Sequence, residues 1–466
     1  MRMWTFLRLA VMMLLEYAIW GAWTPVLSLY LQKELGFNGA QTGQIFSLLW
    51  LACIISPFVG GQIADRWVPT QWFLAAMHFI GGLALWQAAH ATTYASLWPW
   101  QLVYALAFAP TLALTNSLAF KHLTNNERQF GAVRVFGTIG WIVAGLALGL
   151  WRKGVLVPAW GSQADCYVLA AVFSFAMALW CLLLPHTPPT REAESPWAFL
   201  RALRMARDTR FLVFLIISFV VTTELQFYYM LSAPFLNDLG VSPDNVPIVK
   251  DLAQIAEIFV MFVALPLLLP RWGFRKTLAV GVLAWPVRYI IWSIVAYLGH
   301  PVWLVIASLT LHGLCYVFFF TVSQVYVDNI APRDIRHSAQ ALLTLVTLGI
   351  GNYLGTFFSG WIQDLFTHPK LDALGRAVID ATTGQPVRVT EWHLVFLVPI
   401  GITVLCAIAF LLFFREPKPG EVIGAVEGTG PQEEEEADET GAAVVQQAGG
   451  EDQSDPEAED QPPAAL

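Results

Sequence analysis

The sequence predicts an all-α membrane protein whose twelve transmembrane helices form two six-helix pseudo-repeats. Three observations predict this class: the composition, apolar runs of membrane-spanning length, and basic turns that recur at a fixed offset. The 466 residues are 56% hydrophobic, 14% aromatic and only 13% charged, whereas about 25% charged residues is usual in soluble domains. A soluble fold could not bury so much apolar surface, so a lipid bilayer is the expected surrounding.

The apolar runs divide the chain into spans. A helix needs about 17 to 25 apolar residues to cross a hydrocarbon core of about 30 Å. Runs of this kind lie near 9–31, 41–63, 71–91, 97–120, 130–151, 165–185, 211–236, 248–269, 276–298, 302–327, 338–362 and 392–414. The first run contains Glu16 and lacks a small-residue cleavage site, so we expect a span there and not a signal peptide.

Basic residues gather on one side of the expected spans. Of the 26 Lys and Arg, 18 lie on the margin that carries the N-terminus and the loops after even-numbered spans, 7 lie on the opposite margin, and Arg288 lies within a span. The positive-inside rule then places both termini in the cytoplasm.

The last fifty residues differ in composition from the rest. From Glu416 onward fifteen acids accompany one Lys, a net of −14, so the formal charge of −8 leaves +6 for the first 415 residues. High charge and low hydrophobicity predict a disordered acidic cytoplasmic tail over 416–466, whose simplest role is that of a spacer.

An internal repeat organises the remainder. An offset of 205 residues relates Arg66 to Arg271 and Arg128 to Arg333. The substrate pathway of such a duplicated bundle is expected between its halves. We expect an N-terminal six-helix half over 1–185, a basic cytoplasmic linker over 186–210 and a C-terminal six-helix half over 211–415.

The turn after the second span carries Gly61, Asp65 and Arg66, and the turn after the eighth carries Arg271, Arg275 and Lys276. This pattern resembles the loop signature of the major facilitator superfamily. The Gly and Asp-Arg part of the signature lies after the second span, and its basic part lies after the eighth. An Asp there can cap a helix and pair with an Arg, which would bias one access state. The alternative is simple anchoring at the cytoplasmic surface.

The fifth span opens with Arg134, Thr138 and Trp141, which share one helical face at i, i+4 and i+7. The Arg134 guanidinium offers several N–H donors, Thr138 offers a hydroxyl and Trp141 offers a large ring. Together they suit a flat, hydroxylated ligand that stacks on the ring. Alternatively, Arg134 anchors at the lipid headgroups and Trp141 is ordinary packing.

Other polar side chains lie within the second set of spans. Gln226 and Tyr229 share a face of the seventh span at i, i+3, Gln254 and Glu257 do so in the eighth, and Tyr316 lies in the tenth. A primary amide presents a donor and an acceptor together, which suits a nucleobase edge. Hydrogen bonding between helices is an equally good explanation for any one of them.

Three acids are expected deep in the membrane, namely Glu16, Glu224 and Glu257. A charge at that depth costs about 3 kcal/mol or more, so it is usually retained for transport or a proton relay. Glu257 is the first candidate for proton coupling because Gln254 stands one turn away, and Glu16 and Glu224 are the reserves. The structural alternative for these two is pairing with Arg288 or with a backbone group.

Several stretches together resemble a narrower family, the bacterial nucleoside:proton symporters, over about residues 10–415. They are Ile19–Trp23, Ala109–Ser117, Arg134–Gly140, Gln254–Glu257, Arg275–Lys276, Leu311–Gly313 and Ser338–Gln340. The resemblance implies a central nucleoside site lined by Arg134, Thr138, Trp141, Gln226, Tyr229, Gln254, Glu257 and Tyr316. Two positions depart from the family pattern: Tyr229 stands where an Asn can occur, and Val317 stands where relatives have an acid.

The resemblance therefore predicts a secondary transporter in the bacterial inner membrane that imports nucleosides with protons by alternating access. Nucleoside, proton and lipid are the expected partners, and no nucleic acid, cofactor or metal is expected. An enzyme is not expected, because the sequence shows no nucleophile and base pair, metal-ligand cluster or phosphate-binding loop. A facilitator for another hydroxylated solute such as a sugar, and a transporter-fold sensor that signals through its tail, remain as alternatives.

Overall fold

The computed structural model describes residues 3–123, 126–155, 157–189, 197, 199–379, 386–416 and 423; within these, the side chains of 59–62, 64, 65 and 126–128 are not described. The predicted linker and acidic tail therefore lie largely outside the described residues. The first group of helices comprises α1 (Met3–Trp23), α2 (Leu27–Leu29) with a π-helical turn at Tyr30–Glu34, α3 (Gly39–Arg66), α4 (Thr70–Ala89), α5 (Tyr94–His122), α6 (Asn126–Arg152) and α7 (Asp165–Cys181).

The second group contains shorter segments joined end to end. Its elements are α8 (Phe199–Ala202) with a 3-10 turn at Leu203–Arg207, α9 (Thr209–Asp238), α10 (Val246–Phe259), a π-helical turn at Val260–Ala264, α11 (Leu265–Leu298), α12 (Val302–Ser308), α13 (Leu311–Cys315), a π-helical turn at Tyr316–Thr321, α14 (Val322–Ile330), a 3-10 turn at Arg333–Ile335, α15 (Arg336–Thr344), a π-helical turn at Leu345–Gly351, α16 (Asn352–Leu365) and α17 (Trp392–Phe413). A hairpin of β1 (Thr367–Pro369) and β2 (Arg388–Thr390) separates α16 from α17.

Ten helical stretches within the described residues are long and apolar enough to cross a membrane. They correspond to the predicted spans with two differences. The span expected at 165–185 is a 17-residue helix, Asp165–Cys181, and those at 248–269 and 276–298 fall within one 53-residue stretch, Val246–Leu298. The backbone of this stretch leaves the helical region at Gly273, where φ is 72° and ψ is 177°, a conformation that glycine tolerates best.

Local capping explains where several helices begin. Asn38 accepts a hydrogen bond from the Gln41 N–H, and the Gln41 side chain accepts one from the Asn38 N–H, so α3 starts with a capping box. Asp208 likewise caps α9 by accepting from the Arg210 N–H. The hydrogen bonds and charge of Arg210 lower the pKa of Asp208, which keeps this cap ionised and matched to the helix dipole.

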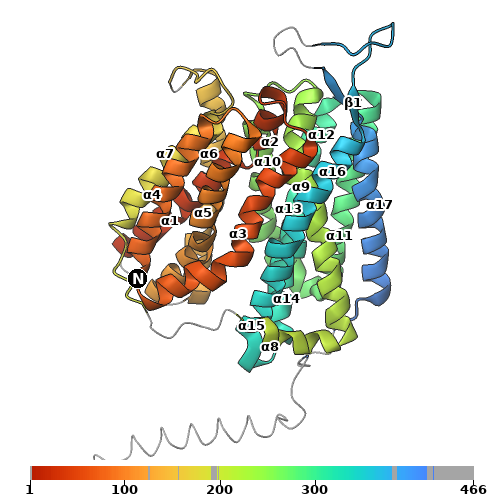
Figure 1. Cartoon of the computed structure of the whole chain (residues 1–466). Helices are drawn as coiled ribbons and strands as arrows, with labels where there is room; N and C mark the ends of the chain where they lie inside the picture. The colour runs from red at the N-terminus through yellow and green to blue at the C-terminus, as the bar shows by residue number, and fades with distance from the viewer. Residues whose placement is uncertain are drawn as a thin grey trace, which may run out of the picture.

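The two groups of helices stand side by side, with α3 between them in the view of Figure 1. We call the end that carries β1 and β2 the hairpin end; the N-terminus, α8 and α15 lie at the opposite end (Figure 1). The strands pair antiparallel, with Thr367 opposite Thr390 and Pro369 opposite Arg388. At the turn of the hairpin, Asp372 accepts N–H bonds from Leu374 and Arg376, which lower its pKa.

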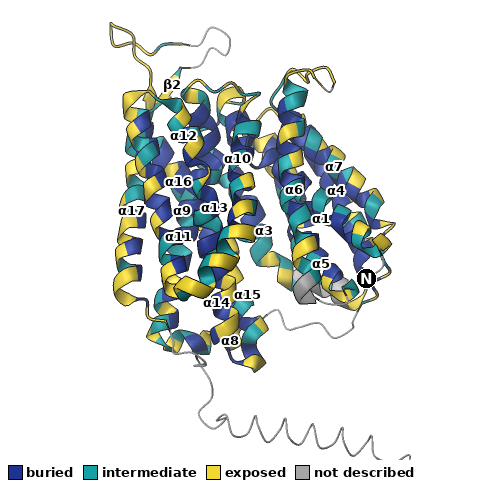
Figure 2. Cartoon of the chain, turned by 180° about the vertical axis from the view of Figure 1, so that it is seen from behind, coloured by how far each residue is buried: buried dark blue, intermediate teal, exposed yellow. Residues whose placement is uncertain are grey.

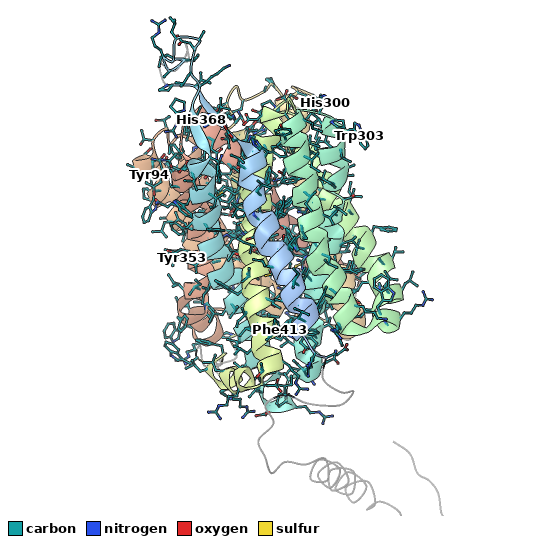
Figure 3. All side chains as sticks on the ribbon, turned by 90° about the vertical axis from the view of Figure 1, so that its right-hand side faces the viewer. Tyr94, His300, Trp303, Tyr353, His368 and Phe413 are labelled. Carbon is teal, nitrogen blue, oxygen red and sulfur yellow. The ribbon has the colours of Figure 1, made fainter. Side chains whose placement is uncertain are left out.

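Figure 2 shows exposed and intermediate residues along the outer helices, and many of the exposed residues are large and apolar. Leu179, Leu405 and Leu412 are each more than 60% exposed. Exposed tryptophans stand near helix ends, among them Trp67 and Trp72 at the opposite end and Trp303 at the hairpin end, where Figure 3 labels it. Apolar flanks with tryptophans near both interfaces are typical of a protein embedded in lipid.

The two groups are in tight contact at the hairpin end. The carboxylate of Asp364 on α16 accepts hydrogen bonds from the N–H groups of Gly39 and Ala40 on α3, at 2.7 and 2.8 Å. Gln32 and Gln363 exchange two hydrogen bonds of 2.8 Å, and Lys33 pairs with Asp238. The hairpin end is therefore closed between the groups in this conformer.

Candidate functional site

A cavity lies between the two groups of helices. The first group contributes residues of α1, α3 and the turn after α1. The second contributes residues of α9, two π-helical turns and α16. The lining residues are Trp20, Trp23, Thr24, Phe46, Leu49, Trp50, Leu225, Gln226, Tyr229, Tyr316, Leu348 and Asn352.

The cavity wall is aromatic, with unpaired polar atoms among its residues. Gln226 Nε2 donates to Asn352 Oδ1 at 2.7 Å. Among the described residues, Gln226 Oε1 has no hydrogen-bond partner, and the buried indole N–H groups of Trp20 and Trp50 and the hydroxyl of Thr24 have none either. Because buried polar groups are normally satisfied, a ligand with an apolar ring and several polar atoms would suit this wall.

A second cavity, of about 500 Å³, continues from the first. It shares Leu225, Tyr316 and Leu348 with the central cavity, and its other lining residues come mainly from the π-helical turns, α14 and α15. Figure 1 places α14 and α15 at the end opposite the hairpin. The open space therefore extends from the centre toward the opposite end, away from the closed contacts.

Three of the eight predicted substrate-binding residues, Gln226, Tyr229 and Tyr316, line the central cavity. Trp141 does not line the cavity but contacts two residues that do. Its indole packs edge-on against Trp20, with ring centroids 5.5 Å apart, and is tilted against the Tyr229 ring, with centroids 6.5 Å apart. Trp141, predicted on the fifth span, therefore packs against the cavity wall but is not itself part of the lining.

Arg134 and Glu257 form a charged set beside Tyr316. The guanidinium of Arg134 lies 4.1 Å above the ring of Tyr17, and its charge acts on both Glu257 and Tyr316. Glu257 is 9% exposed and comes from α10 in the second group, whereas Arg134 comes from α6 in the first. A basic and an acidic side chain from the two groups therefore both interact electrostatically with Tyr316, a residue of the cavity wall.

Gln254 and Thr138 complete the predicted set on the same helices. Gln254 is buried on α10, one turn from Glu257 toward the hairpin end. Thr138 is half-buried on α6, one turn from Arg134. Neither residue lines the central cavity.

Glu16 lies inside the first group. Its Oε2 is 3.0 Å from His78 Nε2, and its Oε1 accepts a hydrogen bond of 2.7 Å from Thr111. All three side chains are buried. The expected alternative of pairing with Arg288 is wrong for Glu16, because His78 on α4 is its partner.

Glu224 is fully buried within the second group, and neither of its carboxylate oxygens has a hydrogen-bond partner among the described residues. Arg288 does not pair with it either. The Arg288 guanidinium lies 4.6 Å from the Tyr228 ring and 4.9 Å from the Trp285 ring and donates to Cys315 Sγ at 3.1 Å. Pairing with Arg288 is thus wrong for Glu224 as well.

Replacing Glu16 should destabilise the protein more than replacing its hydroxyl partner. Glu16→Ala leaves His78 buried without its acid and should cost about 3 to 5 kcal/mol, whereas Thr111→Val removes one hydrogen bond, worth about 1 kcal/mol. Thermal unfolding of the detergent-purified variants measures both. Equal losses would contradict a structural role for the pairing of Glu16 with His78.

The predicted gating motif lies at the opposite end. Gly61 lies on α3, the side chain of Asp65 is not described, and Arg66 is exposed. Arg275 binds within the second group, where its Nη2 donates to the carbonyl of Leu411 at 2.8 Å and its N–H to Glu416 at 3.3 Å. Arg271 and Lys276 are exposed near the same turn of α11.

Sequence reasoning missed two kinds of residue. Trp20, Trp50 and Asn352 line the cavity, but tryptophans are frequent in this sequence and nothing in their spacing distinguished them. Lys250 and Asp251 are buried on α10. Their position within the expected eighth span was a usable signal, because the cost of an intramembrane charge that drew attention to Glu257 applies to them equally.

Two groups of membrane-length helices around a central cavity define a multi-pass membrane transport protein. The family model described as "Nucleoside H+ symporter" matches residues 3–419. The putative nucleoside transporter YegT of Escherichia coli (strain K12) is 35% identical over 416 residues, which are 88% of this chain and 93% of the relative. The nucleoside permease NupG of the same organism is 28% identical over 430 residues, 88% and 96% of the two chains.

Solved structures agree with the sequence relatives. The crystal structure of the nucleoside transporter NupG superimposes with a TM-score of 0.75 at 26% identity and covers 90% of this chain and 100% of that one. A D-xylose–proton symporter, 14% identical with a TM-score of 0.63, shares the fold.

The chain belongs to the nucleoside:proton symporter family and has a major facilitator type of fold. The predicted family and the prediction of a transporter in place of an enzyme are thereby confirmed. Among the described residues no group of three or more His, Cys, Asp and Glu side chains is placed to hold a metal ion.

Proposed function

We propose that this protein imports nucleosides together with protons, by rocking its two groups of helices about the central cavity. The observation that carries the proposal is the aromatic cavity between the groups with its unpaired polar atoms. The relatives add support, since their names specify nucleoside and xanthosine transport. A nucleoside has the matching chemistry, because its base offers a ring face and its sugar offers hydroxyls.

The proposed substrate site combines the cavity with the charged set beside it. Gln226, Tyr229 and Tyr316 contact the nucleoside from the second group, and Trp141 supports the aromatic wall through Trp20. Arg134, Thr138, Gln254 and Glu257 extend the site along α6 and α10. Movement of the two groups would bring these helices closer to a bound ligand.

Glu257 is the proposed proton carrier, with Glu16 and Glu224 as the remaining candidates. Glu257 is favoured because it lies on the second group and interacts electrostatically with Arg134 of the first group and with Tyr316, which lines the cavity. Glu16 and Glu224 lie inside single groups, away from the cavity lining. A proton on Glu257 would release Arg134, so that protonation and ligand binding act on the same contact.

We also propose twelve membrane crossings. Val246–Leu298 would cross twice, with its turn at Gly273 and the exposed Arg271, Arg275 and Lys276, and Asp165–Cys181 would cross once. The termini would be cytoplasmic in a bacterial inner membrane. The halves would be 1–185 and 211–415, joined by the linker 186–210, with the tail 416–466 beyond them.

Uptake into proteoliposomes tests the proposal. Purified protein in sealed vesicles should accumulate labelled uridine or adenosine when the outside is acidified, and unlabelled nucleosides should compete. Competition by glucose, or uptake that ignores the pH gradient, would favour the sugar facilitator. Deletion of 424–466 should leave uptake intact, since a sensor that signals through its tail is the one alternative that needs this segment.

Trp141→Ala should raise the dissociation constant of uridine more than Thr138→Ala does. Loss of the indole removes support for Trp20 and Tyr229, and one aromatic contact of about 1.4 kcal/mol corresponds to about a tenfold change. Thr138→Ala serves as the matched control on the same helix face. Isothermal titration calorimetry of the two purified variants measures the dissociation constant of uridine. Equal or reversed effects on this constant would reject the aromatic role of Trp141.

A further inference from the structure

Asp251 on α10 lies in the contact between the two groups, close to the hairpin end. It is 3% exposed, and its Oδ2 has no hydrogen-bond partner among the residues that the structure describes. The carboxylate rests on the backbone of Gly145 on α6: a Cβ added to Gly145 would lie 2.4 Å from both Asp251 oxygens. The first group therefore encloses this carboxyl only because residue 145 has no side chain.

The neighbouring residue also reaches across to the first group. Lys250 is 4% exposed, and its Nζ donates to the carbonyl oxygen of Pro25 at 2.9 Å. Pro25 directly follows Trp23 and Thr24, which line the central cavity. Lys250 and Asp251 thus stand together in the closed layer between the cavity and the hairpin end.

Charged and titratable groups on α10 and on neighbouring helices lie around this part of the bundle. They are Arg134 and Arg152 on α6, Tyr228 and Tyr229 on α9, Arg288 on α11, His312 and Cys315 on α13, and Lys250 and Glu257 on α10 itself.

These groups have other partners. Arg152 binds Asp165 at 2.7 Å, Lys250 binds Pro25 and lies 5.2 Å above the Tyr228 ring, and Arg288 faces the same ring. Within the described part of the chain, Asp251 takes part in no ion pair.

We propose that Asp251 is a second proton-binding site, which must take up a proton from the hairpin side before the two groups can close there. An ionised carboxylate without a partner is strongly disfavoured in a buried contact, whereas in the open conformer water would solvate it. Protonation removes the charge and allows the carboxyl to lie on Gly145. Acid on the hairpin side therefore favours closure.

This site acts as a latch and carries no proton across the membrane. The hairpin end reopens toward the side from which the proton came, so Asp251 returns the proton there, and the transported proton stays with Glu257. The latch rests on the proposed alternating access, because it needs a conformer in which the hairpin end is open. It would link the start of each cycle to the outside pH independently of the nucleoside.

The distance between the groups at the hairpin end tests the latch without any substrate. Spin labels at Ala95→Cys and Trp303→Cys, both exposed near that end, report opening by double electron–electron resonance on the full chain in nanodiscs. With Asp251 present, the short distance should dominate in mildly acidic buffer and the long distance should gain in mildly alkaline buffer. In Asp251→Asn the short distance should dominate in both buffers.

Two further variants complete the test. Asp244→Asn, a half-buried acid just before α10, is the matched control and should keep the pH response. Gly145→Ala should favour the long distance in both buffers, because its methyl group occupies the place of the carboxyl. An unchanged pH response in Asp251→Asn would overturn the latch. Failure of nucleoside uptake with an intact pH response would instead overturn the proposed function and leave the latch standing.

Discussion

Glu257→Gln is expected to abolish the accumulation of uridine that a proton gradient drives. A proton moving through about 100 mV contributes about 2.3 kcal/mol, enough for about 50-fold accumulation of a coupled solute. Gln keeps the size and hydrogen bonding of Glu257 but cannot bind and release a proton. The accumulation ratio of the variant should therefore fall to about one, while exchange of internal for external uridine continues.

The physical basis is the electrostatic interaction between Arg134 on the first group of helices and Glu257 on the second. An ionised Glu257 is attracted to Arg134, and a protonated one is not, so each proton changes the free energy of that contact. The variant fixes the contact in its neutral form. Transport then proceeds downhill, because no step couples uridine to the movement of a proton across the membrane.

Glu224→Gln provides a matched control for this experiment. It makes the same change at a fully buried acid that does not line the cavity, so gradient-driven accumulation should persist. The measurement is labelled uridine in proteoliposomes under an imposed pH gradient, with counterflow as the test of intact exchange. Normal accumulation by Glu257→Gln, or its loss in Glu224→Gln alone, would contradict the assignment.

Gly360→Val is expected to hold the hairpin end open and to reduce uptake at least about tenfold. A Cβ at position 360 would lie 2.2 Å from the carbonyl oxygen of Gly39, and one at position 39 would lie 2.3 Å from that of Gly360. The two backbones touch where α3 and α16 cross, and small residues alone permit such an approach in membranes. A larger side chain blocks the closed conformer and leaves the open one untouched.

Gly401→Val on α17 is the control, because outside its own helix no atom of the described residues lies within 4 Å of a Cβ built there. Spin-label distances at the hairpin end should lengthen in Gly360→Val and stay unchanged in Gly401→Val. Uptake should fall in Gly360→Val and stay unchanged in Gly401→Val. A Gly360→Val protein that closes normally would show that this crossing does not govern access. Monodisperse elution of both variants excludes misfolding as the cause.

Much of the fold follows from the sequence because lipid imposes a simple rule on it. Apolar runs of spanning length predicted the helices of the first group closely, and Glu16 within α1 did not disturb this. The second group was harder to predict. The turn after α10 stays helical up to Gly273, and π-helical turns interrupt the spans around Tyr316 and Leu348, because such turns depend on packing between helices more than on local sequence.

The candidate site was predictable to a lesser degree. Spacing on one helix identifies side chains that share a face, and Gln226 and Tyr229 do reach the cavity together. It does not show which ring is nearer the ligand space, and Trp20 lies between Trp141 and the cavity. The partner of Glu16 was unpredictable as well, since His78 becomes its neighbour only when α1 packs near α4.

The hairpin between α16 and α17 offers a way to determine the orientation of the protein in reconstituted vesicles. Its turn projects beyond the helices (Figure 1) and Leu374 is 74% exposed. Apart from its chain neighbours, no described atom lies within 4 Å of a Cβ built at Gly375. Exposed turns of this kind tolerate insertions, so an epitope between these two residues should leave the bundle intact. Antibody capture would then sort reconstituted vesicles into right-side-out and inside-out populations before any uptake is measured.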